Sequence, residues 1–377
     1  MTAETPTKPI SFHDPDLIQR PYEAYSYMLS EAPVYYDEST DQYIVSRYED
    51  IRKLVADSTA VNSNGANERL ARAHKPASIL ARINKLFEEK GWPRAAPMGH
   101  YEGEDYRERR DLFERFLRAS KVQEYDGTIQ EIASGQAERL AAKTEADLVS
   151  EYCEQISLRV ICRILGAPDE AIPIVKEATD AMITNVGQLG STEEEEIEVA
   201  LKEIEAQHFF KRMIDEKRAR PDDTILSEFV NSPLPSGYVL TDPEILTLVM
   251  LDLFMAGSET ASKAMASGFY YLCKNPELQQ HLRADLDGNL KTFVEEVLRL
   301  EPPARALARI ALRDITMHGV TIPKDSLVML CVSSANRDTQ RFGCPAEVDL
   351  GRSNAAQHLT FGSGAHSCIG APLARKE

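Results

Sequence analysis

The chain has 377 residues, 43% hydrophobic content and a formal net charge of −17 at pH 7. Its acidic balance argues against nucleic acid or an anionic membrane surface as the main partner. The six cysteines are scattered with no CxxC pair, a pattern that suits reduced thiols in a reducing compartment rather than a disulfide framework.

The N-terminus shows no targeting pattern. Residues 1–21 are polar and contain proline, and they lack the apolar core of a signal peptide or a membrane anchor. The sequence therefore predicts a cytoplasmic protein. Because no internal repeat or long low-complexity linker interrupts the chain, we expect an irregular N-terminal tail over residues 1–20 and a single domain over 21–377.

Short strands are predicted at two places. Residues 33–36 and 42–46 are β-prone and flank a polar turn at 37–41, which predicts a small hairpin. Residues 317–332 show the same pattern of short β-prone runs separated by turns. We expect these segments to form a minor β region.

Most of the remaining chain alternates apolar and charged residues at helical spacing. Residues 156–165, which end before Gly166, are one example. The four acids Glu193–Glu196 predict the solvated start of another helix, because the helix dipole favours acidic side chains there. The sequence therefore predicts a mainly α fold with a minor β region.

A long helix is predicted to begin at Thr241. Thr241 and Glu244 have capping-box spacing, and Pro243 suits the first turn. Residues 245–256 are apolar on nearly every face, so this helix is expected to be buried. The apolar run is too short and too interrupted to span a bilayer. Gly257 costs about 1 kcal/mol relative to alanine in mid-helix, which indicates a need for room or for a distortion there.

The segment from Phe361 to Gly370 carries the strongest chemical signal. It places Cys368 between glycine turns and a predicted helix start, with His366 two residues earlier. Glycine allows positive φ and a close approach to a flat ligand. A thiolate at a helix N-terminus is stabilised by the dipole, which lowers its pKa and suits an anionic ligand of haem iron. The other interpretation is a glycine-rich loop around a buried structural cysteine.

The spacing F-G-x-G-x-H-x-C-x-G resembles the haem loop of the soluble bacterial cytochrome P450 monooxygenases at every fixed position. The resemblance covers nearly the whole chain, from the hairpin near Tyr36 onward. It implies the cytochrome P450 fold, with haem b (iron protoporphyrin IX) between a long central helix and a proximal loop, and O2 as co-substrate. Cys368 is implied as the axial iron ligand. The implied cofactor-binding positions are Arg109, Arg309, Phe361, Gly362, His366, Cys368, Gly370, Ala256 and Gly257.

Residues 256–260 look like the oxygen-binding segment of the family's central helix. The resemblance implies that Glu259 and Thr260 relay protons, beside a groove for dioxygen. The other interpretation is a cap-like Glu–Thr pair on an ordinary core helix.

Glu296 and Arg299 match the family's E-x-x-R helix. Alone, such a pair is usually a surface ion pair worth a few tenths of a kcal/mol. With Arg352, the resemblance implies a buried ion triad that supports the cysteine loop, and removing one partner from it would strand a buried charge.

The sequence departs from the family at two places. Asp105 stands where relatives usually have histidine, four residues before Arg109, although Arg109, Arg309 and His366 still match propionate partners. Because neighbouring carboxylates repel, Asp105 is expected to turn away or to pair with an arginine. His100 could substitute for the histidine, although a lone loop histidine is more often simply solvated. The chain also ends where the family's proximal helix has barely begun, so we expect a C-terminal truncation.

The resemblance implies a monomeric monooxygenase that inserts one oxygen atom of dioxygen into a small or medium organic substrate, by hydroxylation or dealkylation. The alternative is a non-catalytic haem-thiolate sensor or binding protein, which would not need the acid–alcohol pair. Electrons are expected from a separate ferredoxin and an NAD(P)H-dependent ferredoxin reductase. The expected docking face for the ferredoxin is a basic stretch that comprises Arg107, Arg109, Arg110, Arg115, Arg118 and Lys121. The other interpretation of this stretch is a solvated amphipathic helix.

Two charged residues are tentative parts of the substrate pocket. Asp252 lies four and eight residues before Ala256 and Thr260, so the three share one helix face. Arg305 precedes Arg309 by four residues, in a segment that lines the pocket in the family. Either Asp252 and Arg305 pair with each other or with solvent, or one of them holds a polar group of the substrate. Arg305 holding a carboxylate is the favoured case.

Overall fold

The computed structural model describes residues 10–11, 14–72, 75–186 and 192–377, and the chain divides into two compact units. Unit 1 comprises Met1–Leu70 and Lys263–Cys368, and unit 2 comprises Ala71–Ser262 and Ile369–Glu377. The chain is mainly helical with a small β region, which confirms the predicted fold class.

The strands of the described residues all belong to unit 1. They are β1 Val34–Asp37, β2 Gln42–Val45, β3 Val61–Asn62, β4 Leu307–Ala311, β5 Ile315–Met317, β6 Val320–Ile322 and β7 Leu327–Leu330. The helical segments of this unit are α1 Pro15–Gln19, α2 Tyr22–Ser30, α3 Tyr48–Ala56, α15 Pro276–Ala284, α16 Leu286–Leu300, α17 Val332–Ala335 and η5 Ala355–Gln357. α4 Ala66–Arg72 reaches the boundary between the units.

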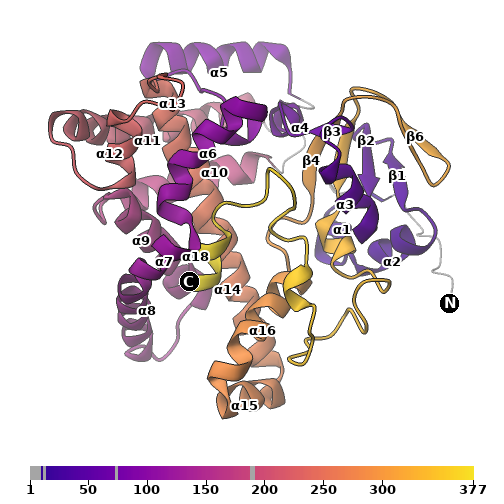
Figure 1. Ribbon diagram of the computed structural model, residues 1–377. Coiled ribbons are helices and arrows are strands. Elements are labelled where there is room, and N and C mark those ends of the chain that lie inside the picture. The colour runs from indigo at the N-terminus through magenta and orange to yellow at the C-terminus, as the bar shows by residue number, and fades with distance from the viewer. Residues whose placement is uncertain (1–9, 12–13, 73–74, 187–191) are drawn as a thin grey trace. The chain divides into compact units, whose positions relative to one another are not determined.

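The main sheet has five strands in the order β1-β2-β7-β4-β3 (Figure 1). The predicted hairpin is confirmed, because β1 and β2 pair antiparallel with Val34 opposite Val45. β7 then joins β2 in parallel and β4 in antiparallel orientation. The predicted strands between residues 317 and 332 are also confirmed, as the two-stranded sheet β5–β6 and as β7.

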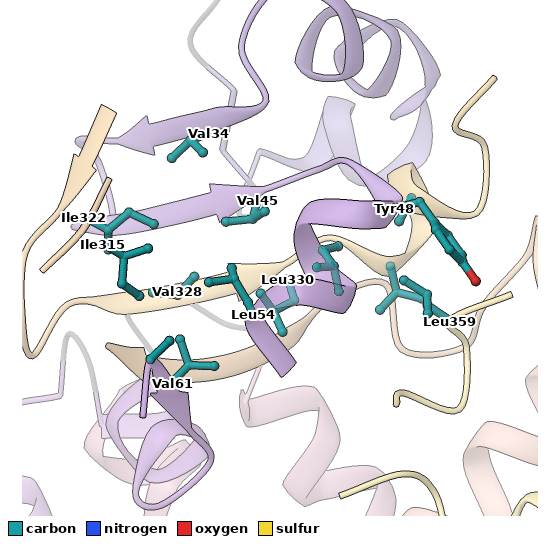
Figure 2. Packing of buried hydrophobic residues seen from close by; sticks show 14 of the residues in the cluster. Val34, Val45, Tyr48, Leu54, Val61, Ile315, Ile322, Val328, Leu330 and Leu359 are labelled. Atoms are coloured by element: carbon teal, nitrogen blue, oxygen red, sulfur yellow. The ribbon is translucent and has the colours of Figure 1, made fainter. Parts of the chain in front are cut away.

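One face of the main sheet packs against α3. Figure 2 shows Leu54 of α3 beside Val328 and Leu330, and Tyr48 of the same helix beside Leu359; all of these side chains are buried. Full burial of a side chain of this size stabilises the fold by about 1.5–3 kcal/mol. This core fixes the sheet on which β4 carries Arg309.

The regular secondary structure in the described residues of unit 2 is entirely helical. Its segments are α5 Ala77–Lys90, η1 Met98–His100, α6 Gly103–Leu117, α7 Ala119–Val122, η2 Gln123–Tyr125, α8 Asp126–Ala141, η3 Val149–Cys153, α9 Glu154–Leu165, α10 Ala171–Val186, α11 Glu193–Ala219, α12 Ile225–Asn231, α13 Asp242–Thr247, η4 Leu248–Met255 and α18 Ala371–Lys376. The helix predicted before Gly166 corresponds to α9, which ends at Leu165.

The predicted long helix is present as three consecutive segments, α13, η4 and α14 Ala256–Lys274. Its capping box is confirmed: the Thr241 N–H donates to Glu244 Oε2 (2.8 Å), and the Glu244 N–H donates to Thr241 Oγ1 (3.5 Å). The expectation that this apolar segment is too short to span a bilayer is wrong by length and composition, because the helical run Asp242–Lys274 has 33 residues and is apolar enough to cross a membrane. However, 61% of its most apolar window is buried inside the protein, and buried core helices pass the same test.

Two local expectations need correction. The N-terminal segment is not wholly irregular, because Asp14 caps the short helix α1 by accepting the N–H of Asp16. Residues 1–9 and 12–13 lie outside the described part of the chain. The acids at the start of α11 are not all solvated either, since Glu196 is buried and pairs with Lys75 at 2.6 Å. An acid on the inward face of a helix start needs such a partner.

Candidate functional site

The cysteine loop is held by its own backbone. The N–H of Cys368 donates to Phe361 O (2.8 Å), and the N–H of Ser367 donates to Gly364 O (3.1 Å). Gly362 and Gly364 have φ of +68° and +76°, and a Cβ on Gly364 would lie 3.1 Å from Val55 O. Glycine is therefore required at Gly364 both for the backbone conformation and for the close packing.

The loop exposes the cysteine side chain. Cys368 is exposed, whereas Cys153, Cys162 and Cys331 are buried. Burial raises the pKa of Cys162 and of Cys331 to about 12, so these two thiols stay protonated. Cys368 lies two residues before Gly370, which is the N-cap of α18. This setting suits a ligand cysteine and excludes the alternative of a buried structural cysteine.

A second group of side chains supports the loop, and the sequence pattern did not single it out. His358 Nδ1 accepts the N–H of Thr360 (3.2 Å), so the ring proton lies on Nε2 and is donated to Glu295 Oε2 (3.0 Å). Asn336 Oδ1 accepts the N–H of Leu359 (2.7 Å). Because both His358 and Glu295 are buried, the pair fixes the chain just before Phe361. The only sequence signal was a second acid beside Glu296.

The expected ion triad is assembled in unit 1. Glu296 Oε1 lies 2.6 Å from Arg299 Nε and 2.9 Å from Arg352 Nε. Burial alone would raise the pKa of Glu296, but the hydrogen bonds from Arg299 and from the N–H of Asp349 lower it below the usual value. Arg299 also donates to the carbonyl oxygen of Asn336 (3.0 Å). The triad thus ties α16 to the segment that precedes the cysteine loop.

The three expected propionate partners have different surroundings. Arg309 lies half-buried on β4, and both ring nitrogens of His366 lie 3.4 Å from Ser63 Oγ. Arg109 is buried on α6, where it donates to Glu244 Oε1 (3.1 Å) and lies 3.7 Å above the ring centroid of Tyr101. The Arg109 guanidinium therefore already has a carboxylate partner, Glu244, in this structure.

Asp105, which replaces the family's usual histidine, and His100, its possible substitute, both lie in unit 2. Asp105 is exposed, and its backbone carbonyl accepts a hydrogen bond from Arg109 (3.3 Å). His100 lies half-buried in η1.

The central helix is distorted where the sequence indicated. The π-helical segment η4 ends at Met255, just before Gly257. A Cβ on Gly257 would lie 2.9 Å from Cδ1 of Ile161 on α9, so glycine also allows close packing there. Ala256 and Thr260 are exposed, and the Thr260 hydroxyl donates to Ala256 O (2.7 Å). The helix therefore presents a small side chain and an alcohol on one open face.

Asp252 and Arg305 each have a partner within their own unit. Asp252 Oδ2 accepts the N–H of Met98 (3.0 Å), and burial raises the pKa of this carboxyl to about 7. Arg305 is exposed and donates to the carbonyl oxygen of Ile18.

These residues fit a haem with a thiolate ligand. Cys368 presents its side chain from a glycine-turn loop in which Gly364 has positive φ and a Cβ would crowd Val55 O. Arg309 and His366 lie in the same unit as Cys368 and have groups that can bind the carboxylates of a haem. Ala256 and Thr260 form an exposed stripe on a helix whose other faces are largely buried.

Comparison with known proteins agrees with this geometry. The family model described as "Cytochrome P450" matches residues 81–377. Cytochrome P450(MEG) of Priestia megaterium is 30% identical over 361 residues, which cover 95% of this chain and 84% of that protein. The solved structure of cytochrome P450 CREJ with (4-ethylphenyl) dihydrogen phosphate has a TM-score of 0.85 and 26% identity, covering 98% of this chain and 88% of that one. P450BioI with a hexadec-9Z-enoic acid-ligated acyl carrier protein has a TM-score of 0.82 and 25% identity, covering 96% and 90%.

Proposed function

The chain belongs to the cytochrome P450 family of haem-dependent monooxygenases, and we propose that it inserts one oxygen atom of dioxygen into a small or medium organic substrate by hydroxylation or dealkylation. The exposed Cys368 in its glycine-turn loop is the observation that carries this proposal. No observation favours a sensor over an enzyme. The acidic composition and the buried central helix support a cytoplasmic enzyme that acts without a membrane.

The cofactor is a haem with a thiolate ligand, which we propose to be haem b. When bound, haem supplies the iron at which dioxygen is reduced by two electrons. Cys368 would hold the iron, while Arg309, His366 and Arg109 would hold the propionates. The buried triad around Glu296 and the pair of Glu295 with His358 keep the loop in place during turnover.

We propose that Thr260 and Glu259 deliver the protons that oxygen insertion requires. The Thr260 hydroxyl donates its own hydrogen bond to Ala256 O, so its oxygen can accept a hydrogen bond from a group on the open face of the helix. Glu259 is half-buried one residue earlier and can exchange protons with water. To pass a proton on, the Thr260 hydroxyl must turn from Ala256 O toward the open face of the helix.

Thr260→Ala is expected to bind substrate and accept electrons normally but to release more hydrogen peroxide. Product per reducing equivalent should fall about tenfold, less than the ~10²–10⁴ of a lost general acid, because a water can partly replace the hydroxyl. Ser258→Ala is the matched control: its hydroxyl makes the same bond to the carbonyl four residues earlier, Phe254 O at 2.6 Å, but is buried. Unchanged coupling in both Thr260→Ala and Glu259→Gln would mean that protons arrive by another route.

We further propose that the electron donor is a small acidic ferredoxin that docks on α6 and α7. Several basic residues of this stretch are already paired within the protein: Arg110 with Glu114 (2.7 Å), Lys121 with Glu124 (2.7 Å) and Arg115 with Glu228. Arg118 is exposed at the C-cap of α6. α7 also contacts α18, which carries Arg375 and Lys376. Arg118 is therefore the best single candidate for contact with an acidic partner.

Reduction by a ferredoxin should slow as salt is added, because screening weakens steering between opposite charges. Arg118→Glu should reduce the rate about tenfold at low salt and much less at high salt. Arg163→Glu, an equal charge change at an exposed site on α9, is the control and should leave the rate nearly unchanged. Stopped-flow reduction of the carbon monoxide-saturated enzyme measures both rates, and salt-independent reduction would count against this docking face.

A further inference from the structure

Asp252 carries a carboxyl group on the same face of the central helix as the proposed oxygen-binding stripe. Asp252, Ala256 and Thr260 are spaced four residues apart, and Ala256 and Thr260 are exposed. Residues at this spacing lie one above the other along a helix. Because eight residues of helix separate them, the Asp252 carboxyl lies about two turns from the Thr260 hydroxyl, within the same unit.

Only one oxygen of this carboxyl is occupied by the described residues. Oδ2 accepts the N–H of Met98 at 3.0 Å. Asp252 keeps part of its surface accessible, and Oδ1 is not among the enclosed polar atoms that lack a partner. Oδ1 is therefore not fully enclosed and can contact a ligand.

Within the described part of unit 2, no counter-ion neutralises this carboxyl. Burial raises the pKa of Asp252 to about 7 and the Met98 N–H lowers it, without a contribution from any charged side chain. The helices α9 and α10 both pack against η4, but their charged side chains have partners other than Asp252 or are exposed. The pairs are Arg159 with Asp169, Lys176 with Glu154 and Asp180, and Glu177 with Lys202. Arg163 is exposed. On the same long helix Asp242 pairs with Arg218 and Lys211 and Glu244 with Arg109, and His100 lies two residues after Met98 in η1.

We propose that Asp252 selects substrates that carry a cationic alkylammonium group. This inference rests on the proposed monooxygenase function and names its substrate class. An ionised carboxylate without a counter-ion in an apolar wall is unfavourable, and a substrate cation removes that cost. A substrate carboxylate would face the same negative charge and be disfavoured. Arg305 offers no competing anchor in this arrangement, because it is exposed and bound to Ile18 O.

The competing explanation is that Asp252 only clamps the chain before α6. Thr247, five residues earlier on the same helix, holds this segment too, because its hydroxyl oxygen accepts a hydrogen bond from the N–H of Ala95 (3.1 Å). Asp252 binds Met98 in the same way, but a neutral amide or hydroxyl would suffice for that task. The two roles separate experimentally, because Asp252→Asn keeps an oxygen for the Met98 N–H and removes the charge.

The test compares two ligands of nearly equal shape in the haem-loaded enzyme, the cation benzyltrimethylammonium and its neutral isostere neopentylbenzene. A third ligand, 3-phenylpropanoate, carries a negative charge. A quaternary nitrogen has no lone pair and cannot ligate the iron. Binding is measured by calorimetry and by the spin-state shift. The wild-type enzyme should bind the cation about tenfold to a hundredfold more tightly than Asp252→Asn does, while the isostere should bind both proteins equally.

The pH dependence gives an independent signature. With a pKa of about 7, the ionised fraction of the Asp252 carboxyl rises between pH 6 and pH 8. Affinity for the permanently charged ligand should rise with it, by about tenfold, because only the ionised form attracts the cation. Neopentylbenzene, and the cation in Asp252→Asn, should show no such rise.

Thr247→Val is the matched control, since it removes a clamp of the same segment without removing charge. It should leave the preference for the cation intact. Equal affinity of wild type and Asp252→Asn for the cation, tighter binding of the anion, or loss of the preference in Thr247→Val would each overturn the proposal. Oxidation of neutral substrates together with no cation preference refutes this inference alone, whereas failure to oxidise any bound ligand with a ferredoxin system refutes the proposed function itself.

Discussion

Replacing Cys368 with serine should abolish the thiolate-type absorption of the reduced, carbon monoxide-bound protein and reduce oxygen insertion to background. An alcohol does not ionise readily enough to serve as the anionic ligand that a thiolate provides. The loop itself should survive, because the N–H of residue 368 donates to Phe361 O through the backbone and Gly364 keeps its turn. The loss is therefore chemical rather than structural.

Absorption spectra of the reduced carbon monoxide complex, product analysis and thermal unfolding measure these effects together. Cys344→Ser is the control, since Cys344 is also exposed in unit 1 but lies outside the loop. It should keep the spectrum and the activity. If Cys368→Ser retained both, another residue would hold the iron and the assignment of the site would be wrong.

The elements that the sequence predicted correctly have local causes. The hairpin follows from two β-prone runs around a polar turn, and the start of the central helix follows from the capping-box spacing of Thr241 and Glu244. Each signal lies within one short stretch of contiguous chain. The cysteine loop could be found in the same way, because its glycines, histidine and cysteine are contiguous.

Partners that lie far apart in the chain could not be predicted from local patterns. Glu196 was expected to be solvated, yet it pairs with Lys75. His358 meets Glu295 across 63 residues, and Asp252 meets the N–H of Met98 across 154 residues. Helical periodicity says which face a side chain occupies but not which segment will cover that face. Partner choice depends on tertiary packing.

The buried triad provides the second large effect. Glu296→Leu should destabilise unit 1 by about 3–5 kcal/mol, because it leaves Arg299 and Arg352 without their shared carboxylate. Urea unfolding at pH 7, followed by circular dichroism and by haem release, measures the loss. Asp57→Asn is the control. It breaks the ion pair with Arg313 (2.9 Å), in which the arginine side chain is 52% exposed and the aspartate side chain 41%, so it should change the stability far less than Glu296→Leu does. A comparable loss in both variants would contradict the buried triad.

The pH dependence of this stabilisation has a definite sign. The pKa of Glu296 is lowered in the folded protein, so the unfolded chain binds its proton at a higher pH than the folded chain does. The triad's contribution is therefore complete above the ordinary glutamate pKa of about 4.3 and is lost as pH falls below it. Wild type should lose stability over that range, and Glu296→Leu should lose less. Equal acid sensitivity of the two proteins would mean that Glu296 is not the carboxylate that carries this dependence.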